Sequence, residues 1–266
     1  MQPSSLTSQI LASKISGIGH LVLNRPEKFN AISYEMWQGI RTVVEDYSRN
    51  DDVRVIVVSG AGGKAFSAGA DISQFEKQRG TKEAIKNYNT NVKAAYTALS
   101  TTEKPTVAKI DGYCFGGGLA MALFCDLRIA SEEAEFSIPA AKLGLGYGYD
   151  LLRQLVDLVG AAYAKEILYT ARKFSAGEAC DMGLVNRVVP QESLDEYVNR
   201  YVENIAGNAP LTIRAAKIVI GEILKDPESR DLEMCNRVIN TCYESDDYKE
   251  GRQAFMEKRK PFFKAR

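Results

Sequence analysis

The sequence predicts an α/β fold, and three observations carry this prediction. Short apolar runs rich in β-branched residues alternate with helical patterns up to about residue 200. The run VRVIVVSG (53–60) is almost continuously apolar, which is typical of a strand covered on both faces. Two Gly-rich loops, at 60–71 and 111–118, each follow a predicted strand and precede a helical pattern. We therefore expect an α/β core over 1–207 and a helical region over 208–266.

The first elements have clear signals. A strand from Gly19 to Leu23 ends at Asn24-Arg25-Pro26, because proline cannot continue a strand ladder. Ser33 is placed to cap a helix. The apolar residues after it recur at helical spacing on one face: Met36, Trp37, Ile40, Val43, Val44 and Tyr47. After the loop at 60–71, a polar stretch leads into a helical pattern that runs to about Ser100.

The middle of the chain repeats the unit of strand, Gly-rich loop and helix. TVAKI (106–110) is the strand, DGYCFGGG (111–118) the loop and LAMALFC (119–125) a helix of small residues. A further strand is predicted at 126–130, and the segment 136–150 is expected to be a loop.

Helix starts and a last strand follow from shorter signals. A helix begins near Leu151. Ser175 with Glu178 and Ser193 with Glu196 both fit the spacing of a capping box. A short strand is predicted at 184–190, and beyond Asn208 the pattern is helical throughout.

Composition excludes several function classes. The 34 basic and 34 acidic residues give no net charge, so no basic excess indicates a nucleic-acid partner. His20, the single histidine, lies between apolar residues of the first strand, where a structural role is expected. The five cysteines form no metal-binding pattern, and they indicate reduced thiols in a cytoplasmic protein. The lone histidine and the scattered cysteines predict no metal site. With no secretory signal or apolar spanning segment, we also expect no membrane binding.

The two Gly-rich loops are the strongest chemical signal. Glycine and alanine at a strand-to-helix turn leave backbone N–H groups open to a ligand, so the two loops can each supply one N–H to a shared anion. Neither loop matches a P-loop, and GLGYG (144–148) is not a dinucleotide fingerprint. Tight packing turns without a function remain the alternative interpretation.

Five motifs in order along the chain resemble the crotonase superfamily, the enoyl-CoA hydratase/isomerase group. They are NRPEKFNA (24–31), AFSAGADI (65–72), DGYCFGGG (111–118), DMGLVNRVVP (181–190) and EGRQAFMEKRKPFF (250–263). The resemblance implies a spiral of ββα repeats with a C-terminal helical region for trimerisation. It also implies a homotrimer or dimer of trimers that acts on an acyl-CoA thioester, with coenzyme A as part of the substrate and no separate cofactor.

The resemblance also assigns residues. The backbone N–H groups of Ala70 and Gly117 would form an oxyanion hole for the thioester oxygen. The implied residues of the substrate and coenzyme A groove are Lys28, Phe29, Ala31, Ala68, Asp71, Ile72, Tyr113, Gly116, Ala140 and Leu143. Phe255 and Lys258 would reach the nucleotide or pantetheine arm from the tail. That tail, 249–266, holds seven basic residues and two glutamates, which suits a polyphosphate; a solvated helix face is the alternative.

One departure from the pattern determines the expected reaction. Hydratases of this family hold two glutamates where this chain has Ala120 and Ala140. Alanine cannot transfer a proton, and positioned acid–base groups contribute about 10²–10⁴-fold each. Tyr147 falls where a methylmalonyl-CoA decarboxylase-like member has a functional tyrosine, so decarboxylation of a short malonyl-type CoA is the preferred reaction.

Three alternatives stay open at this stage. Tyr149 and Asp150 are other acid–base candidates, and Asp150 or a water molecule would suit a hydratase or isomerase. The Tyr-rich loop could instead pack at a subunit contact. A non-catalytic acyl-CoA-binding protein is the alternative from a different function class.

Overall fold

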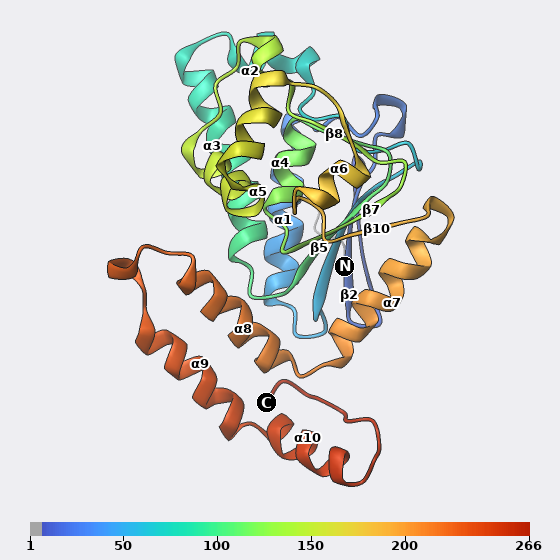
Figure 1. Ribbon diagram of the computed structural model, residues 1–266, viewed down its shortest axis with the longest axis vertical. Coiled ribbons are helices and arrows are strands. Elements are labelled where there is room, and N and C mark those ends of the chain that lie inside the picture. The colour runs from blue at the N-terminus through green and yellow to red at the C-terminus, as the bar shows by residue number, and fades with distance from the viewer. Residues whose placement is uncertain (1–6) are drawn as a thin grey trace.

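Two β-sheets form the centre of the molecule in the computed structural model, which describes residues 7–266 apart from the side chains of Lys77 and Arg79 (Figure 1). The larger sheet has the order β1 (Ile10–Ile15), β2 (Ile18–Leu23), β3 (Val55–Gly60), β5 (Thr106–Ile110), β7 (Leu127–Ser131) and β10 (Arg187–Val189). The smaller sheet has the order β4 (Ala65–Ser67), β6 (Tyr113–Phe115), β8 (Glu135–Ser137) and β9 (Phe174–Ser175). β1 is antiparallel to β2, and the other pairs in the larger sheet are parallel.

The middle of the chain alternates between the two sheets. β3 is followed by β4, β5 by β6 and β7 by β8, so each of these three strands of the larger sheet continues into a short strand of the smaller sheet. Helices follow each such pair. They are α2 (Phe75–Arg79) and α3 (Lys82–Thr101), then α4 (Gly117–Leu123), then α5 (Tyr149–Thr170). This succession is the spiral of ββα repeats that the resemblance implies, and the predicted α/β class is confirmed.

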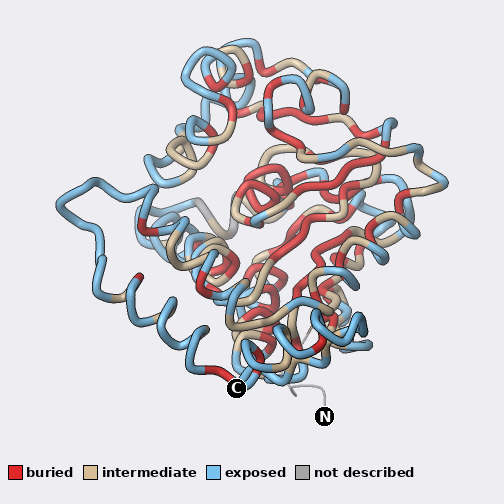
Figure 2. Tube along the Cα trace, turned by 60° about the horizontal axis from the view of Figure 1, so that its bottom comes forward, coloured by how far each residue is buried: buried red, intermediate tan, exposed pale blue. Residues whose placement is uncertain are grey.

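The larger sheet is covered by helices on both faces. α1 (Tyr34–Arg49) lies against one face, and all six apolar residues predicted for its inner face are buried. The Ser33 hydroxyl accepts a hydrogen bond from the Met36 N–H at 3.2 Å, as expected for the cap. α7 (Leu194–Gly207) covers the other face with Leu194, Val198 and Val202. α6 (Ala176–Asp181) precedes β10. Figure 2 shows the buried strands between these exposed helix surfaces.

Several predictions were wrong in detail. The first element that the structure describes is an unpredicted strand, β1, joined to β2 through Ser16 and Gly17, which both have positive φ. The expected loops at 111–118 and 136–150 contain β6, the end of β8 and a 3-10 helix at Pro139–Leu143.

Of the two predicted capping boxes, the one at Ser175 and Glu178 is confirmed. Ser193 does not cap α7, because a 3-10 turn at Gln191–Ser193 runs straight into the helix and holds Ser193 in a helical conformation.

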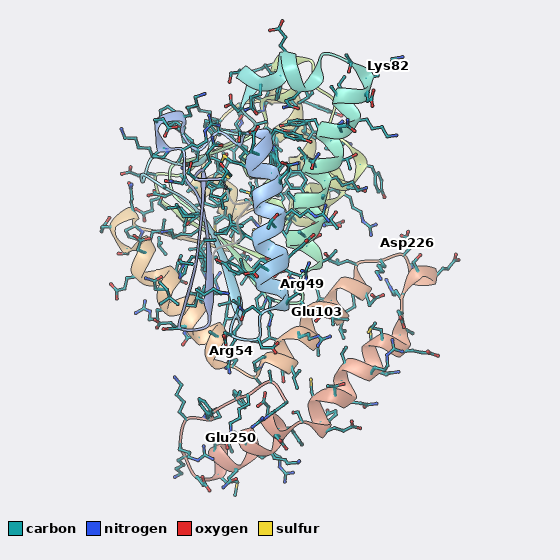
Figure 3. The ribbon with its side chains drawn as sticks, turned by 180° about the vertical axis from the view of Figure 1, so that it is seen from behind. Arg49, Arg54, Lys82, Glu103, Asp226 and Glu250 are labelled. Carbon is teal, nitrogen blue, oxygen red and sulfur yellow. The ribbon has the colours of Figure 1, made fainter. Side chains whose placement is uncertain are left out.

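The C-terminal helices extend away from the core. They are α8 (Pro210–Ile223), α9 (Leu232–Glu244) and α10 (Asp246–Met256) (Figure 1). Arg54 Nη2 donates to the Phe263 carbonyl at 2.5 Å, and Arg214 pairs with Glu103 at 2.8 Å. Figure 3 shows Arg54 and Glu103 at this junction and Glu250 out on α10. In the described part of the chain, every helix is too short or too polar to cross a bilayer.

Candidate active site

The two Gly-rich loops meet so closely that a side chain at Gly69 or Gly117 would be crowded. A Cβ atom on Gly117 would lie 3.2 Å from the Ala70 nitrogen. A Cβ atom on Gly69 would lie 3.0 Å from the Phe115 carbonyl and 3.2 Å from the Gly117 nitrogen. Gly69 also has a φ of 103°, which favours glycine. The two sequence-predicted donors, the amides of Ala70 and Gly117, are therefore neighbours in space.

Both amides are oriented for an external acceptor. Ile32 and Ala70 form a parallel bridge in which the Ile32 N–H donates to the Gly69 carbonyl and the Asp71 N–H donates to the Ile32 carbonyl. The Ala70 N–H consequently lies on the side away from Ile32. Gly117 is the first residue of α4, so its N–H has no acceptor within the helix, and the positive end of the helix dipole adds to it. Two such donors can stabilise a developing oxyanion.

An ion pair that the sequence analysis did not assign holds the first loop. Arg25 Nη1 lies 2.9 Å from Asp71 Oδ2, and both side chains are less than a tenth exposed. The same nitrogen donates to the Ala31 carbonyl at 2.8 Å. Burial raises the pKa of Asp71, but hydrogen bonds from Ser73 and Arg25 outweigh burial and leave the pKa below its ordinary value. The charged Asp71 side chain, held by Arg25, thus fixes the backbone directly after Ala70, whose N–H is the proposed donor.

Asn30, fully buried, ties the segment 24–31 to this loop. Its Nδ2 donates to the carbonyls of Ala61 and Ala65 at 2.9 and 2.7 Å, and its Oδ1 accepts from the Arg25 N–H. The Asn30 carbonyl accepts from Ser67 Oγ, which in turn accepts from the Gly69 N–H. The NRPEKFNA motif contains Arg25 and Asn30, but only their burial reveals their role.

Aromatic side chains pack behind the second loop. Trp37 Cζ2 lies 3.4 Å from the position of a Cβ on Gly117. Trp37 Nε1 donates to Tyr88 Oη at 3.2 Å, and the Tyr96 hydroxyl donates to the Gly117 carbonyl at 3.4 Å. The rings of Trp37 and Tyr96 meet edge to face at 5.3 Å. These contacts hold Gly117 in place beside the Ala70 loop.

The two alanines of interest lie on elements that adjoin the second loop. Ala120 is on α4, three residues after Gly117, and its N–H donates to the Gly116 carbonyl. Ala140 is on the 3-10 helix that follows β8, whose Ser137 carbonyl accepts from the Gly116 N–H at 2.8 Å. Both alanines are buried. Neither side chain can donate or accept a proton.

The segment that holds the other catalytic candidates is a turn. The Leu145 N–H donates to the Ala140 carbonyl, which brings the chain back after Leu143. Tyr147 is half-buried and packs against the main core, whereas Tyr149 is 75 % exposed. Asp150 is exposed and forms an ion pair with Lys93 of α3 at 2.6 Å.

The structure gathers most of the predicted groove residues around the first loop. Lys28 Nζ lies 3.6 Å from Asp71 Oδ2, the Ala68 N–H donates to the Phe29 carbonyl, and the Phe29 and Tyr113 rings lie 5.9 Å apart. Ile72 and Leu143 are exposed. Two predicted residues are not part of this group.

Phe255 and Lys258 belong to the C-terminal region instead. Phe255 lies on α10 and is 81 % exposed, and Lys258 follows the end of that helix. Figure 1 shows α10 at the lower end of the molecule, away from α4, which lies within the core. Within one chain, the structure therefore does not bring these two residues to the loops.

Away from the two loops, the features to consider are a surface groove and any cluster of metal ligands. A groove between α1 and α3 is lined by Arg41, Glu45, Thr90, Lys93 and Thr97, among others, and as the described residues define it, it contains no predicted site residue. Among residues 7–266, no three His, Cys, Asp or Glu side chains lie close enough to hold a metal ion.

Comparison with known proteins adds independent evidence. The family model for enoyl-CoA hydratase/isomerase matches residues 13–266. A crotonyl-CoA hydratase of Syntrophomonas wolfei is 33% identical over 96% of this chain and 97% of its own length. A peroxisomal Delta(3,5)-Delta(2,4)-dienoyl-CoA isomerase of Arabidopsis thaliana is 35% identical over 93% of each chain. A solved structure from Magnetospirillum magneticum, described as an enoyl-CoA hydratase/carnithine racemase, is 35% identical with a TM-score of 0.92 over 98% of this chain and 97% of that chain. The chain therefore belongs to the enoyl-CoA hydratase/isomerase family.

Proposed function

We propose that this protein is an acyl-CoA enzyme that stabilises a thioester enolate between the backbone amides of Ala70 and Gly117. The close approach of the two loops that carry these amides is the observation that carries the proposal: a Cβ atom built on Gly117 would lie only 3.2 Å from the Ala70 nitrogen. Two fixed donors bind the enolate oxygen more strongly than the neutral thioester oxygen, and this difference lowers the barrier. The names of the matched relatives support an acyl-CoA thioester as substrate.

The preferred reaction is decarboxylation of a short malonyl-type CoA. The bond between the carboxylate carbon and Cα breaks, its electron pair enters the enolate, and carbon dioxide leaves. This step needs no general base, which fits a site with Ala120 and Ala140 in the positions where the family's hydratases hold glutamates. The Tyr147 hydroxyl would orient the leaving carboxylate. A proton from water then adds to Cα in place of the carbon dioxide that left, which gives the shorter acyl-CoA.

Hydration or isomerisation is the second candidate, because the matched relatives include a hydratase and an isomerase. Asp150 would then supply the acid–base group. Its exposed ion pair with Lys93 makes it a weak candidate, since the pair keeps the carboxylate at the surface.

A substrate panel separates these candidates. Purified protein is incubated with methylmalonyl-CoA, crotonyl-CoA and a 3-enoyl-CoA, and the products are followed by mass spectrometry. We expect decarboxylation of methylmalonyl-CoA, reduced about 10²-fold in Tyr147→Phe. Tyr169→Phe, at a 75 % exposed position on α5, is the matched control and should leave the rate unchanged.

Two other outcomes would change the proposal. Rapid hydration of crotonyl-CoA that persists in both Tyr147→Phe and Asp150→Asn would contradict the decarboxylase preference and the role of Asp150. Binding of all three thioesters with turnover of none would favour a non-catalytic acyl-CoA-binding protein.

We also propose that the region 208–266 assembles the chain into a homotrimer or dimer of trimers. α8 and α9 expose large apolar side chains, namely Ile220, Ile223, Leu224, Leu232 and Tyr243. In such an assembly Phe255 and Lys258 would serve the coenzyme A groove of another copy. Light scattering should give a mass three or six times that of the 29.3 kDa chain, and a monomeric mass would contradict this assembly.

A further inference from the structure

A fully buried positive charge lies at the C-terminal end of α4. Arg128, on β7, is 2 % exposed. Among the described residues, its guanidinium donates to backbone carbonyls alone. Nη1 reaches Ala122 O at 3.1 Å and Cys125 O at 2.7 Å, Nε reaches Leu184 O at 2.7 Å, and Nη2 reaches Asp126 O at 3.4 Å.

This charge has no counter-ion. Across residues 7–266, no carboxylate lies within ion-pair distance of the Arg128 guanidinium; the neighbouring Asp126 carboxylate instead accepts from the Thr106 N–H and pairs with Lys217. Burial lowers the pKa of Arg128, yet an arginine side chain stays protonated in proteins. Because a buried charge without an ionic partner is costly, its carbonyl acceptors must compensate for the lost water.

Two of those carbonyls belong to the end of α4. Ala122 is in the last turn of the helix and Cys125 follows it. The Ala122 carbonyl also accepts from the Cys125 N–H at 3.2 Å in the turn that closes the helix. Carbonyls at this end carry the partial negative charge of the helix, so a cation is favourable there. Gly117 begins the same helix, and seven residues span about 10 Å. Arg128 therefore contacts one end of the helix whose other end supplies a proposed oxyanion donor.

Arg128 is itself held by a separate part of the chain. Its N–H donates to Asn186 Oδ1 at 2.8 Å, and the Asn186 N–H donates to the Arg128 carbonyl at 2.9 Å. Its Nε contact with Leu184 links the same segment to the guanidinium. At the other end of α4, the Tyr96 hydroxyl donates to the Gly117 carbonyl. The helix is thus fixed at both ends.

We infer that Arg128 is a positioning residue for the oxyanion hole. By bonding the carbonyls of Ala122 and Cys125, it fixes α4 along its axis and keeps the Gly117 amide beside the Ala70 amide. Its charge at the negative end of the helix supports the same orientation. This inference rests on the proposed function, because it concerns how that donor pair is held.

The test measures how strongly the site polarises a thioester. Butyryl-CoA labelled with ¹³C at the thioester carbonyl is the probe, since its saturated chain can be neither hydrated nor decarboxylated. Isotope-edited infrared spectroscopy of the bound probe should show the carbonyl stretch moved to lower frequency in the unmodified protein. In Arg128→Lys we expect loss of about half of that shift, because a single ammonium cannot bond the carbonyls at the end of α4 and Leu184 together. Affinity for free coenzyme A should change little.

The control separates positioning from stability. Val202→Ala removes a buried methyl pair on α7, on the other face of the larger sheet, and lowers stability without touching α4. Compared at the same loss of Tm as Arg128→Lys, Val202→Ala should keep the full infrared shift of the bound thioester. If Arg128→Lys keeps the full shift as well, the inference is overturned. If Arg128→Lys does not fold, Asn186→Ala loosens the Arg128 backbone instead, and an unchanged shift there is equally contradictory. The absence of any shift in the unmodified protein would overturn the oxyanion hole, and the role of Arg128 with it.

Discussion

Replacing Gly117 by alanine should lower turnover about 10²–10³-fold while leaving the fold intact. The added Cβ would lie 3.2 Å from the Ala70 nitrogen and 3.4 Å from Trp37 Cζ2, so it would crowd the Ala70 amide and push the two proposed donors apart. The loss expected for one oxyanion donor is of this size, about 2.7–4 kcal/mol. Steady-state kinetics on the substrate identified by the panel measures it, and the fall should appear in kcat.

Gly207→Ala is the matched control for this substitution. Gly207 ends α7, and a Cβ there would meet no atom within 4 Å. The control should keep the turnover of the unmodified protein. Equal activity of Gly117→Ala and Gly207→Ala would show that the amide pair does not bind the reacting oxygen.

Replacing Arg25 by methionine should destabilise the protein by about 3–5 kcal/mol. The substitution leaves the buried Asp71 carboxylate without its closest cation, and breaking a buried pair costs this much. Lys28, 3.6 Å from Asp71 and half exposed, replaces that cation only in part. Urea unfolding at pH 7 measures the effect. Arg41→Met, which removes an exposed pair with Glu45, should cost less than about 1 kcal/mol.

The defect should also depend on pH in a defined direction. The pKa of Asp71 lies below its ordinary value of 3.8 in the folded protein, so this carboxylate stabilises the fold above that pH and its contribution is lost as the pH falls through the folded pKa. In Arg25→Met the buried carboxylate keeps only Lys28 at 3.6 Å as a cation, so protonation relieves more of the cost of its burial. The difference from the unmodified protein should therefore shrink below about pH 4. A constant difference from pH 7 to pH 3 would contradict a charged pair at this position.

Local patterns predicted much of the fold. The inner face of α1 follows from the spacing of Met36, Trp37 and Ile40, because helical periodicity is a property of neighbouring residues. The covered strand at Val55–Gly60 follows from its β-branched run for the same reason. The three-residue strands β6 and β8 gave no such signal, since they depend on pairing between distant segments: β6 pairs with β4 and β8, and β8 pairs with β6 and β9. Ser193 met the spacing of a cap but not its conformation.

The backbone donors of the candidate site could be predicted from the sequence, but the buried side chains that hold them could not. Glycines at 69, 116 and 117 indicated loops open to a ligand, and the resemblance assigned the Ala70 and Gly117 amides. Arg25 and Asp71 are 46 residues apart in the chain, and Arg128 and Leu184 are 56 apart. Charged residues are ordinarily exposed, so only the folded chain reveals that these side chains are buried.

A crystal structure with butyryl-CoA bound would test the central claim most directly. The thioester oxygen should lie about 2.7–3.1 Å from both the Ala70 and the Gly117 nitrogens. A thioester group seated elsewhere, such as the groove between α1 and α3, or an oxygen out of hydrogen-bond reach of both amides, would contradict the account.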